Sequence, residues 1–315
     1  MSTPSQTDTS REGGLKAYSN QLRGAAATVR EARELYRLHA SDVRSNVAGV
    51  LEVLRDAERR VDAEYGFAIE GRRALDIGAG QRLIHLVYLA RANRAVGIDL
   101  EVIAHGVRPR QYLRMLRANG ARRTGKTIAR KLLRLDARYM NEVKRQLGLA
   151  RIPSFDLLRM DATDLSFPDA SFDFVFSYSV FHHIPDPGRA IDEAVRVTAP
   201  GGVVYISFHL YSSDTGSLDL RVMRGDPAIP LWPHLRPGTG VPVDQNAFLN
   251  RLRLPAWEAL FRARMPDCRI VHRNTERARL EREARRLQER GELVGYDLEE
   301  LLTREVIVMW RKPAD

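Results

Sequence analysis

The stretch from Arg73 to Gly80 constrains the fold more than any other, because a short apolar run ends there in an acid and two glycines. Its first five residues, 73–77, have the length and composition of a buried strand. Gly78 and Gly80 let the backbone turn sharply and leave it bare enough for a ligand to lie against it. In open α/β sheets, ligands bind at the carboxyl ends of the strands. The stretch therefore predicts a strand, a tight turn and a binding edge.

Apolar segments alternate with helical patterns along most of the chain. Strands are predicted over residues 73–77, 95–99, 155–160, 172–177, 203–208, 269–272 and 305–310, and helices over 81–92, 187–197, 244–266 and 275–291. Successive strand–helix–strand units favour parallel pairing with right-handed crossovers. The predicted fold class is therefore α/β, with a Rossmann-like, mostly parallel sheet and helices on both faces.

The chain divides into three parts by composition. Residues 1–14 are polar and predicted to be a disordered tail, 15–66 to form an N-terminal helical cap, and 67–315 to form the main domain. The tail lacks the apolar segment of a secretory signal, and no apolar run approaches the roughly 20 residues that span a bilayer. The single cysteine, Cys268, excludes an internal disulfide bond. We therefore expect a cytoplasmic protein.

The net charge of +10 is concentrated in one segment, residues 105–151, which interrupts the alternation. It carries 14 Lys or Arg residues against two acids, so the remainder of the chain sums to about −2. We expect a helical insertion, broken near Asn119-Gly120 and Thr124-Gly125. An anionic partner such as a nucleotide-sugar diphosphate, a lipid-linked diphosphate, an acidic membrane or RNA would explain the charge, and a merely solvated face is the alternative. Its two aromatic residues are too few for a base-stacking surface.

Three acids lie at the ends of three successive predicted strands, at what would be one edge of the sheet: Asp76, Asp99 and Asp161. Asp99 lies 19 residues after Gly80, where an acid accepts hydrogen bonds from ribose hydroxyls in dinucleotide folds. The third glycine of a nicotinamide-binding loop is missing. An acid just before the glycines suits a cation, and S-adenosylmethionine (SAM) carries both an ammonium and a sulfonium group.

Four strings occur in the order and spacing of one family: ALDIGAG (74–80), VGIDL (96–100), MDATDLSFPDASFDFVFSYSVFHHI (160–184) and APGG (199–202). On these strings the sequence resembles the small-molecule branch of the class I SAM-dependent methyltransferases, over about residues 67–210. The resemblance implies a seven-stranded sheet whose final strand is antiparallel, and SAM as cofactor. The residues that it implies for SAM binding are Asp76, Gly78, Ala79, Gly80, Asp99, Leu100, Asp161, Ala162 and Ser177.

The sequence says less about the methyl acceptor than about the cofactor. After the fourth predicted strand the chain reads Ser-Tyr-Ser-Val (177–180) instead of the Asn/Asp-Pro-Pro-Tyr of many base N-methylating enzymes, which disfavours transfer to adenine amines. A base that takes a hydroxyl proton would come from His183, His209 or Asp214, just past strand ends. Residues 209–242 form a long polar loop with Trp232, which suits a sugar-like acceptor unless the tryptophan only packs the loop. No metal cluster with convincing spacing is present.

The resemblance implies methyl transfer to a hydroxyl of a small molecule or glycan precursor, and the acceptor would carry phosphate if the basic insertion serves it. Two alternatives stay open: an RNA methyltransferase guided by the insertion, and a non-catalytic SAM-binding protein. A homodimer through the N-terminal helices is a further option.

Overall fold

The computed structural model describes residues 42–104, 109–245 and 247–314, with the side chain of residue 122 outside the description. The predicted tail, 1–14, and the first part of the predicted cap therefore lie outside the described residues. The remainder of the cap is one helix, α2 (Val43–Tyr65). Asp42 caps its first turn by accepting from the Ser45 backbone N–H at 2.9 Å.

Seven strands form one sheet, as predicted. They are β1 (Arg73–Ile77), β2 (Arg94–Asp99), β3 (Asp156–Arg159), β4 (Phe172–Tyr178), β5 (Thr198–His209), β6 (Arg269–Arg273) and β7 (Glu305–Arg311). Their order across the sheet is β3-β2-β1-β4-β5-β7-β6. The pairs among β1 to β5 are parallel, whereas β7 is antiparallel to both β5 and β6. The final strand of the chain is thus the antiparallel one, which confirms the expected topology.

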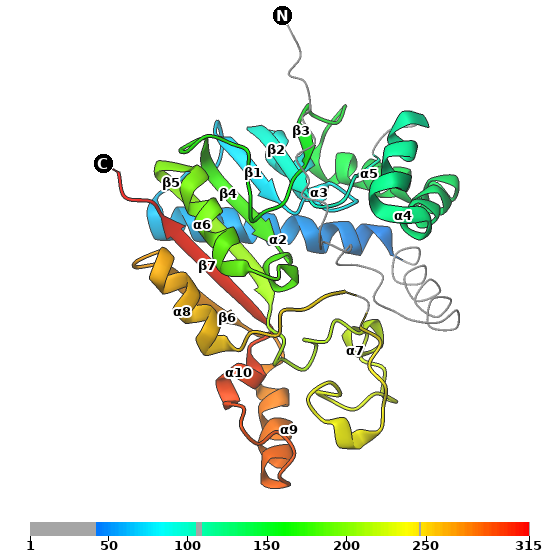
Figure 1. The fold of residues 1–315 in the computed structure, drawn as a ribbon, viewed down its shortest axis with the longest axis vertical. Helices are drawn as coiled ribbons and strands as arrows, with labels where there is room; N and C mark the ends of the chain where they lie inside the picture. The colour runs from blue at the N-terminus through cyan, green and yellow to red at the C-terminus, as the bar shows by residue number, and fades with distance from the viewer. Residues whose placement is uncertain (1–41, 105–108, 246, 315) are drawn as a thin grey trace, which may run out of the picture.

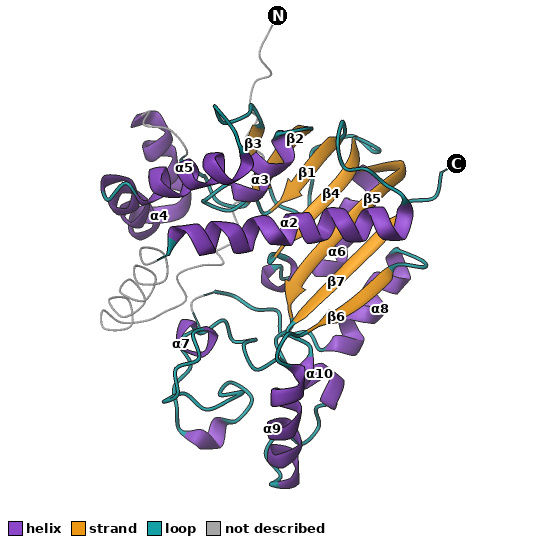
Figure 2. Ribbon diagram, turned by 180° about the vertical axis from the view of Figure 1, so that it is seen from behind, coloured by secondary structure: helices purple, strands orange, loops and turns teal. Residues whose placement is uncertain are grey.

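Helices cover both faces of the sheet (Figures 1 and 2). One face carries α2, α3 (Ile84–Ala90) and α5 (Leu135–Leu147), and the other carries α6 (Pro187–Val197) and α8 (Leu254–Arg264). The buried residues of α2 recur at helical spacing and pack on the first face: Val47, Leu51, Leu54, Ala57 and Val61. Burial of each larger side chain contributes about 1.5–3 kcal/mol, which holds this long helix across the sheet.

A satellite layer lies beyond the sheet's carboxyl edge. It contains α7 (Leu220–Met223), the short 3-10 turn Pro237–Thr239, α9 (Arg277–Glu289) and α10 (Leu298–Leu302). Trp232 is fully buried there against apolar residues of α9 and α10. The tryptophan therefore packs the loop and offers no exposed platform for a sugar.

The basic insertion is helical, and it breaks at one of the two predicted places. Helix α4 (Pro109–Leu132) is interrupted at Gly120, whose φ is 80° and ψ is 166°. The second break is at Arg134, with φ 54°, before α5 begins. Thr124 instead stays helical and donates its hydroxyl to the Gly120 carbonyl at 3.0 Å, which supports the turn after the break. None of the described helices is both long and apolar enough to cross a bilayer.

Candidate functional site

The glycine loop leaves β1 as a tight turn against β2. The backbone N–H groups of Gly78 and Ala79 both donate to the Ile98 carbonyl at 2.9 Å. Gly78 has φ 81°, and a Cβ at this position would lie 2.2 Å from a methyl group of Val180. Gly80 also has positive φ, and its N–H donates to Asp99 at 3.0 Å. Both glycines are therefore required by backbone conformation, and Gly78 also by space.

Asp76 is a buried acid at the end of β1. Its side chain is 0% exposed, and neither carboxylate oxygen has a hydrogen-bond donor among the residues that the structure describes. Burial, followed by the nearby charge of Asp99, raises the pKa of Asp76 to about 8. A buried carboxylate with no donor is costly unless a ligand supplies one. The ammonium group of SAM is such a donor, so the site fits this cofactor.

Asp99 ends β2 beside the glycine loop. Its two oxygens accept from the N–H groups of Gly80 and Glu101, at 3.0 and 2.8 Å. Burial raises the pKa of Asp99 to about 6, although these two hydrogen bonds favour its charged form. Glu101 is itself buried and paired with Arg123 at 2.7 Å. Asp99 is thus held rigidly at the edge where a ribose would lie.

The other predicted cofactor residues flank the same edge. Asp161 follows β3, and one of its oxygens accepts from both the N–H and the hydroxyl of Thr163 at 2.9 Å. Leu100 and Ala162 are half-buried, and Ala162 packs against the core beneath α6 and α8. Register places β1, β2 and β3 side by side, so the three acids share one edge. Their roles toward SAM stay predictions.

Ser177 lies at this edge but faces the protein. It is fully buried, and its hydroxyl donates to the Ile77 carbonyl at 2.9 Å. This bond ties β4 to the end of β1 just before the glycine loop. The side chain that we expected to line the methionine side is therefore engaged in holding the two strands together.

Three histidines gather past the ends of β4 and β5. The rings of His182 and His183 lie 4.1 Å apart, and those of His182 and His209 lie 5.8 Å apart. Burial lowers the pKa of His183 to about 4 and lowers the pKa of the other two as well. All three imidazoles are therefore neutral near pH 7. The two predicted histidine bases thus belong to one cluster, with His182 between them.

A segment of the loop before α8 holds this cluster in place. Asn250 donates from its backbone to the His182 carbonyl at 3.0 Å and from its side chain to the carbonyls of Phe181 and Ile184. The Phe248 carbonyl lies 2.7 Å from Nδ1 of His183. Because a carbonyl only accepts, Nδ1 carries the proton and Nε2 the lone pair. No motif in the sequence signals Asn250, since its partners lie about 66–69 residues away.

Asp214 is paired in a way that does not suit a proton acceptor. It is 2% exposed, and both of its oxygens accept from the guanidinium of Arg304, one of them at 2.7 Å. Arg304 also bonds Glu276. Asp219 is similarly engaged, by Arg221 at 2.7 Å and by the Asp244 backbone N–H at 2.9 Å. In this structure Asp214 anchors the loop after β5 to the start of β7.

A cavity of about 310 Å³ lies between the loop after β5 and the segment before α8, and none of the three clustered histidines lines it. It is lined by Tyr211, Ser212, His234, Leu235, Arg251, Leu252, Arg253 and Tyr296. Ser212 Oγ and His234 Nδ1 are buried in this region, and neither has a hydrogen-bond partner in the described part of the chain. His234 holds its other nitrogen 2.7 Å from the Tyr211 carbonyl, so Nδ1 carries the lone pair. The polar composition of residues 209–242 signalled a functional loop, but not which side chains would line a cavity.

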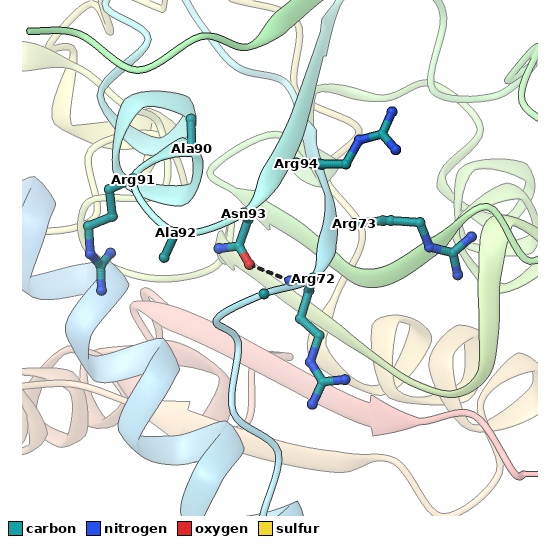
Figure 3. A pocket seen from close by; sticks show the side chains of 8 residues that line it. Arg72, Arg73, Ala90, Arg91, Ala92, Asn93 and Arg94 are labelled. Carbon is teal, nitrogen blue, oxygen red and sulfur yellow. Dashed lines mark hydrogen bonds between the residues drawn. The ribbon is translucent and has the colours of Figure 1, made fainter.

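A larger groove, of about 400 Å³, lies at the opposite edge of the sheet (Figure 3). It is formed around the starts of β1 and β2 and is rich in arginine. Arg73 is paired with Asp173 at 2.6 Å and Arg91 with Glu58 at 2.9 Å. The Arg72 backbone donates to Asn93 at 2.8 Å. Since this edge is the amino end of the strands, it is remote from the glycine loop.

Within the ranges that the structure describes, no three His, Cys, Asp or Glu side chains are arranged to hold a metal ion.

Part of the chain matches a known protein family. Residues 103–206, about a third of the chain, match a family described as "Methyltransferase domain". A Cereibacter sphaeroides phosphatidylethanolamine N-methyltransferase is 38% identical over 73 residues, which is 23% of this chain and 34% of that protein. Arabidopsis thaliana chloroplastic tocopherol O-methyltransferase is 38% identical over 72 residues, 23% of this chain and 20% of that protein. The alignments thus span a fifth to a third of these relatives.

Among solved structures, Haemonchus contortus phosphoethanolamine N-methyltransferase 2 in complex with SAM aligns with 82% of this chain and 52% of that chain. The identity is 16% and the TM-score is 0.43. The family match includes β3, β4 and most of β5, whereas β1, β2 and the glycine loop lie outside it. The sheet as a whole has the seven strands and the antiparallel final strand that the sequence resemblance implied. The chain carries a class I SAM-dependent methyltransferase domain.

Proposed function

We propose that the chain transfers the methyl group of SAM to a hydroxyl group of a small molecule. The observation that carries the proposal is the cluster of neutral histidines past β4 and β5, at the same edge of the sheet as Asp76. A neutral imidazole accepts a proton, whereas the paired carboxylate of Asp214 is already occupied by Arg304. A hydroxyl needs such an acceptor as its oxygen attacks a methyl group.

Bound SAM supplies a methyl group on a positively charged sulfur. In our proposal Asp76 and the backbone of residues 78–80 hold its methionine part, and Asp99 accepts from the ribose hydroxyls. Asp161 and the Ala162 backbone meet the adenine, and Leu100 packs on its face. Positioning of the two reactants supplies most of the acceleration, because transfer from a sulfonium needs little further activation.

His209 and His183 are the two candidate proton acceptors. His183 presents Nε2 with its lone pair, fixed by the bond of Nδ1 to the Phe248 carbonyl. His209 ends β5, and its pKa is lowered by burial while the nearby Glu305 opposes that shift. Because Glu305 stabilises an imidazolium at this position, His209 is better suited than His183 to hold a proton briefly.

The 310 Å³ cavity offers space for the remainder of the acceptor. It begins at Tyr211, two residues after His209, and reaches Arg251, which follows the Asn250 contact with His182. The lone pair on His234 Nδ1 and the Ser212 hydroxyl both fit hydroxyl groups of a ligand. A hydroxylated acceptor therefore suits the cavity better than a purely apolar one.

Relatives of the chain include both O- and N-methyltransferases by name. We favour oxygen because the chain after β4 lacks the amide-containing motif for base amines and has histidines instead. An RNA acceptor is the second candidate, since the insertion is basic. It is disfavoured because only two aromatic residues lie in the insertion, and one of them, Tyr139, is 4% exposed and lies under the Arg82 guanidinium, so it offers no stacking platform.

The test is a panel of paired acceptors that differ only in carrying a hydroxyl or an amine, with formation of S-adenosylhomocysteine as the readout. We expect turnover with hydroxyl members, and a drop of about 10²-fold or more in His209→Gln with unchanged SAM affinity. His272→Gln, on β6 and in contact with Glu258 and Glu299, is the matched control. Turnover only with amines, or full activity of His209→Gln, would contradict the proposal.

A further inference from the structure

The insertion exposes apolar side chains to an unusual degree. The structure leaves nine large apolar side chains exposed among the residues it describes, and five of them lie in α4 and the residue after it. These five are Leu113, Leu116, Ile128, Leu132 and Leu133. Leu132 is 80% exposed and Leu133 57%. Contiguous exposed apolar residues on a folded domain mark a docking surface more often than isolated ones do.

The apolar residues share faces within each half of α4. Leu113 and Leu116 are three residues apart before the break at Gly120, and Ile128 and Leu132 are four apart after it. Spacings of three and four put side chains on the same side of a helix. Each half therefore presents its own apolar stripe, and the break lets the two halves take different directions.

Cations surround these stripes, and acids are absent. Residues 109–134 contain nine Lys or Arg residues and no Asp or Glu. Arg110, Arg117 and Arg134 are exposed. Leucine side chains among cations match the two layers of an anionic bilayer surface, since the leucines enter the acyl boundary and the cations meet lipid phosphates. RNA matches only the charge, because it offers no apolar layer to receive the leucines.

The insertion is anchored rigidly to the cofactor edge of the sheet. Asn119 forms two hydrogen bonds with the backbone of Val102, at 3.0 and 2.8 Å, and Arg123 pairs with buried Glu101. Glu101 in turn donates its N–H to Asp99. Figure 1 shows α4 at the outer end of the molecule, beyond β3 and away from α8 and α9. A membrane surface bound by α4 would therefore lie close to the carboxyl ends of the strands, where the candidate SAM site is.

We propose that the exposed leucines and arginines of α4 and its C-terminal turn dock the protein on anionic lipid bilayers. Lipid molecules are not consumed in this step. The bilayer concentrates the enzyme at a surface from which amphiphilic molecules can reach the edge next to Asp99. The docking does not depend on which group is methylated, so it can fail or hold independently of the proposed function.

The experiment measures flotation of the full chain with phosphatidylcholine vesicles, with and without phosphatidylglycerol. We expect binding to the anionic vesicles that weakens with added salt. Leu132→Ser with Leu133→Ser should weaken it about tenfold or more, since both side chains lose apolar contact. The matched control is Val294→Ser, which changes another highly exposed apolar residue outside the insertion, 73% exposed.

Charge is tested separately by two triple variants. Replacing Arg110, Arg117 and Arg134 with glutamine should weaken vesicle binding on the order of 100-fold, because each cation near an anionic surface contributes about fivefold to the affinity. Glutamines in place of Arg282, Arg286 and Arg290, which are exposed around α9, change the net charge equally and should leave binding intact. Circular dichroism and thermal unfolding confirm that each variant is folded.

Three results would overturn the proposal: equal binding to neutral and anionic vesicles, equal loss in both arginine variants, or no effect of the leucine changes. Tight, salt-sensitive binding of transfer RNA that survives the leucine changes, with no vesicle binding, would assign the surface to RNA instead.

Discussion

Proton release on SAM binding follows directly from the state of Asp76. Without ligand the pKa of this buried carboxyl is about 8, so at pH 7 it is about 0.9 protonated. An ammonium group beside the carboxylate favours its charged form and lowers its pKa. SAM binding at pH 7 should therefore release about 0.9 proton from Asp76, with about 0.1 more from Asp99, whose pKa is about 6.

Calorimetric titration with S-adenosylhomocysteine in buffers of different ionisation enthalpy measures this number. In Asp76→Asn the release should fall to about 0.1 proton, because only Asp99 still contributes. The affinity should fall as well, since the neutral amide cannot pair with the ammonium. Asp164→Asn, which changes an acid three residues after Asp161, is a control that should keep the wild-type release.

The same substitution tests the sign of the stability effect. A raised pKa in the folded state means that the unfolded chain loses its proton first, so the free energy of unfolding falls as pH rises from about 4 to about 8. At pH 7 this penalty is up to about 4 kcal/mol. Asp76→Asn should remove it and stabilise the ligand-free protein in urea unfolding. No proton release in the wild type, or destabilisation by Asp76→Asn at pH 7, would refute the reasoning.

Three further variants extend the account. Asp99→Asn should weaken S-adenosylhomocysteine binding in calorimetry by about tenfold or more, since charged hydrogen bonds to ribose contribute about 1.5–3 kcal/mol, and unchanged affinity would remove Asp99 from the site. Gly78→Ala should lower the free energy of unfolding measured in urea by about 2–4 kcal/mol, because of the positive φ and the clash with Val180. Adding Val180→Ala should restore only the part that is due to the clash. Asp214→Asn should lower the free energy of unfolding by about 2–4 kcal/mol, because Arg304 loses one charged partner. Turnover of the folded fraction should change little. An intact fold with lost turnover would instead support Asp214 as a base.

The sheet could be predicted because its strands are nearly continuous apolar runs that end in acids and glycines. The boundaries of the helices were harder to predict. The helix predicted from residue 81 begins at Ile84, because Leu83 adopts φ 56° and prolongs the glycine loop. The helix predicted over 244–266 is confined to Leu254–Arg264, because the segment before it contacts the histidine segment through Phe248 and Asn250.

The site could be predicted in its positions but not in its pairings. Strand register alone puts Asp76, Asp99 and Asp161 on one edge. Among the described residues Asp76 has no hydrogen-bond partner, whereas Asp214 is paired with Arg304. Pairings of this kind join residues far apart in the sequence, 90 residues in the case of Asp214 and Arg304. Sequence patterns with periods of two or 3.6 residues carry no information about such pairs. For the same reason, the sequence did not predict the contacts of Asn250 or the burial of Trp232.

The central claim is that SAM lies at the carboxyl edge of β1, β2 and β3, with its ammonium on Asp76 and its ribose on Asp99. A crystal structure of the full chain with S-adenosylhomocysteine tests it most directly. We expect the homocysteine ammonium within hydrogen-bond distance of Asp76 and the ribose hydroxyls on Asp99. A ligand seated in the arginine-lined groove at the opposite edge, or a ribose that does not contact Asp99, would contradict it.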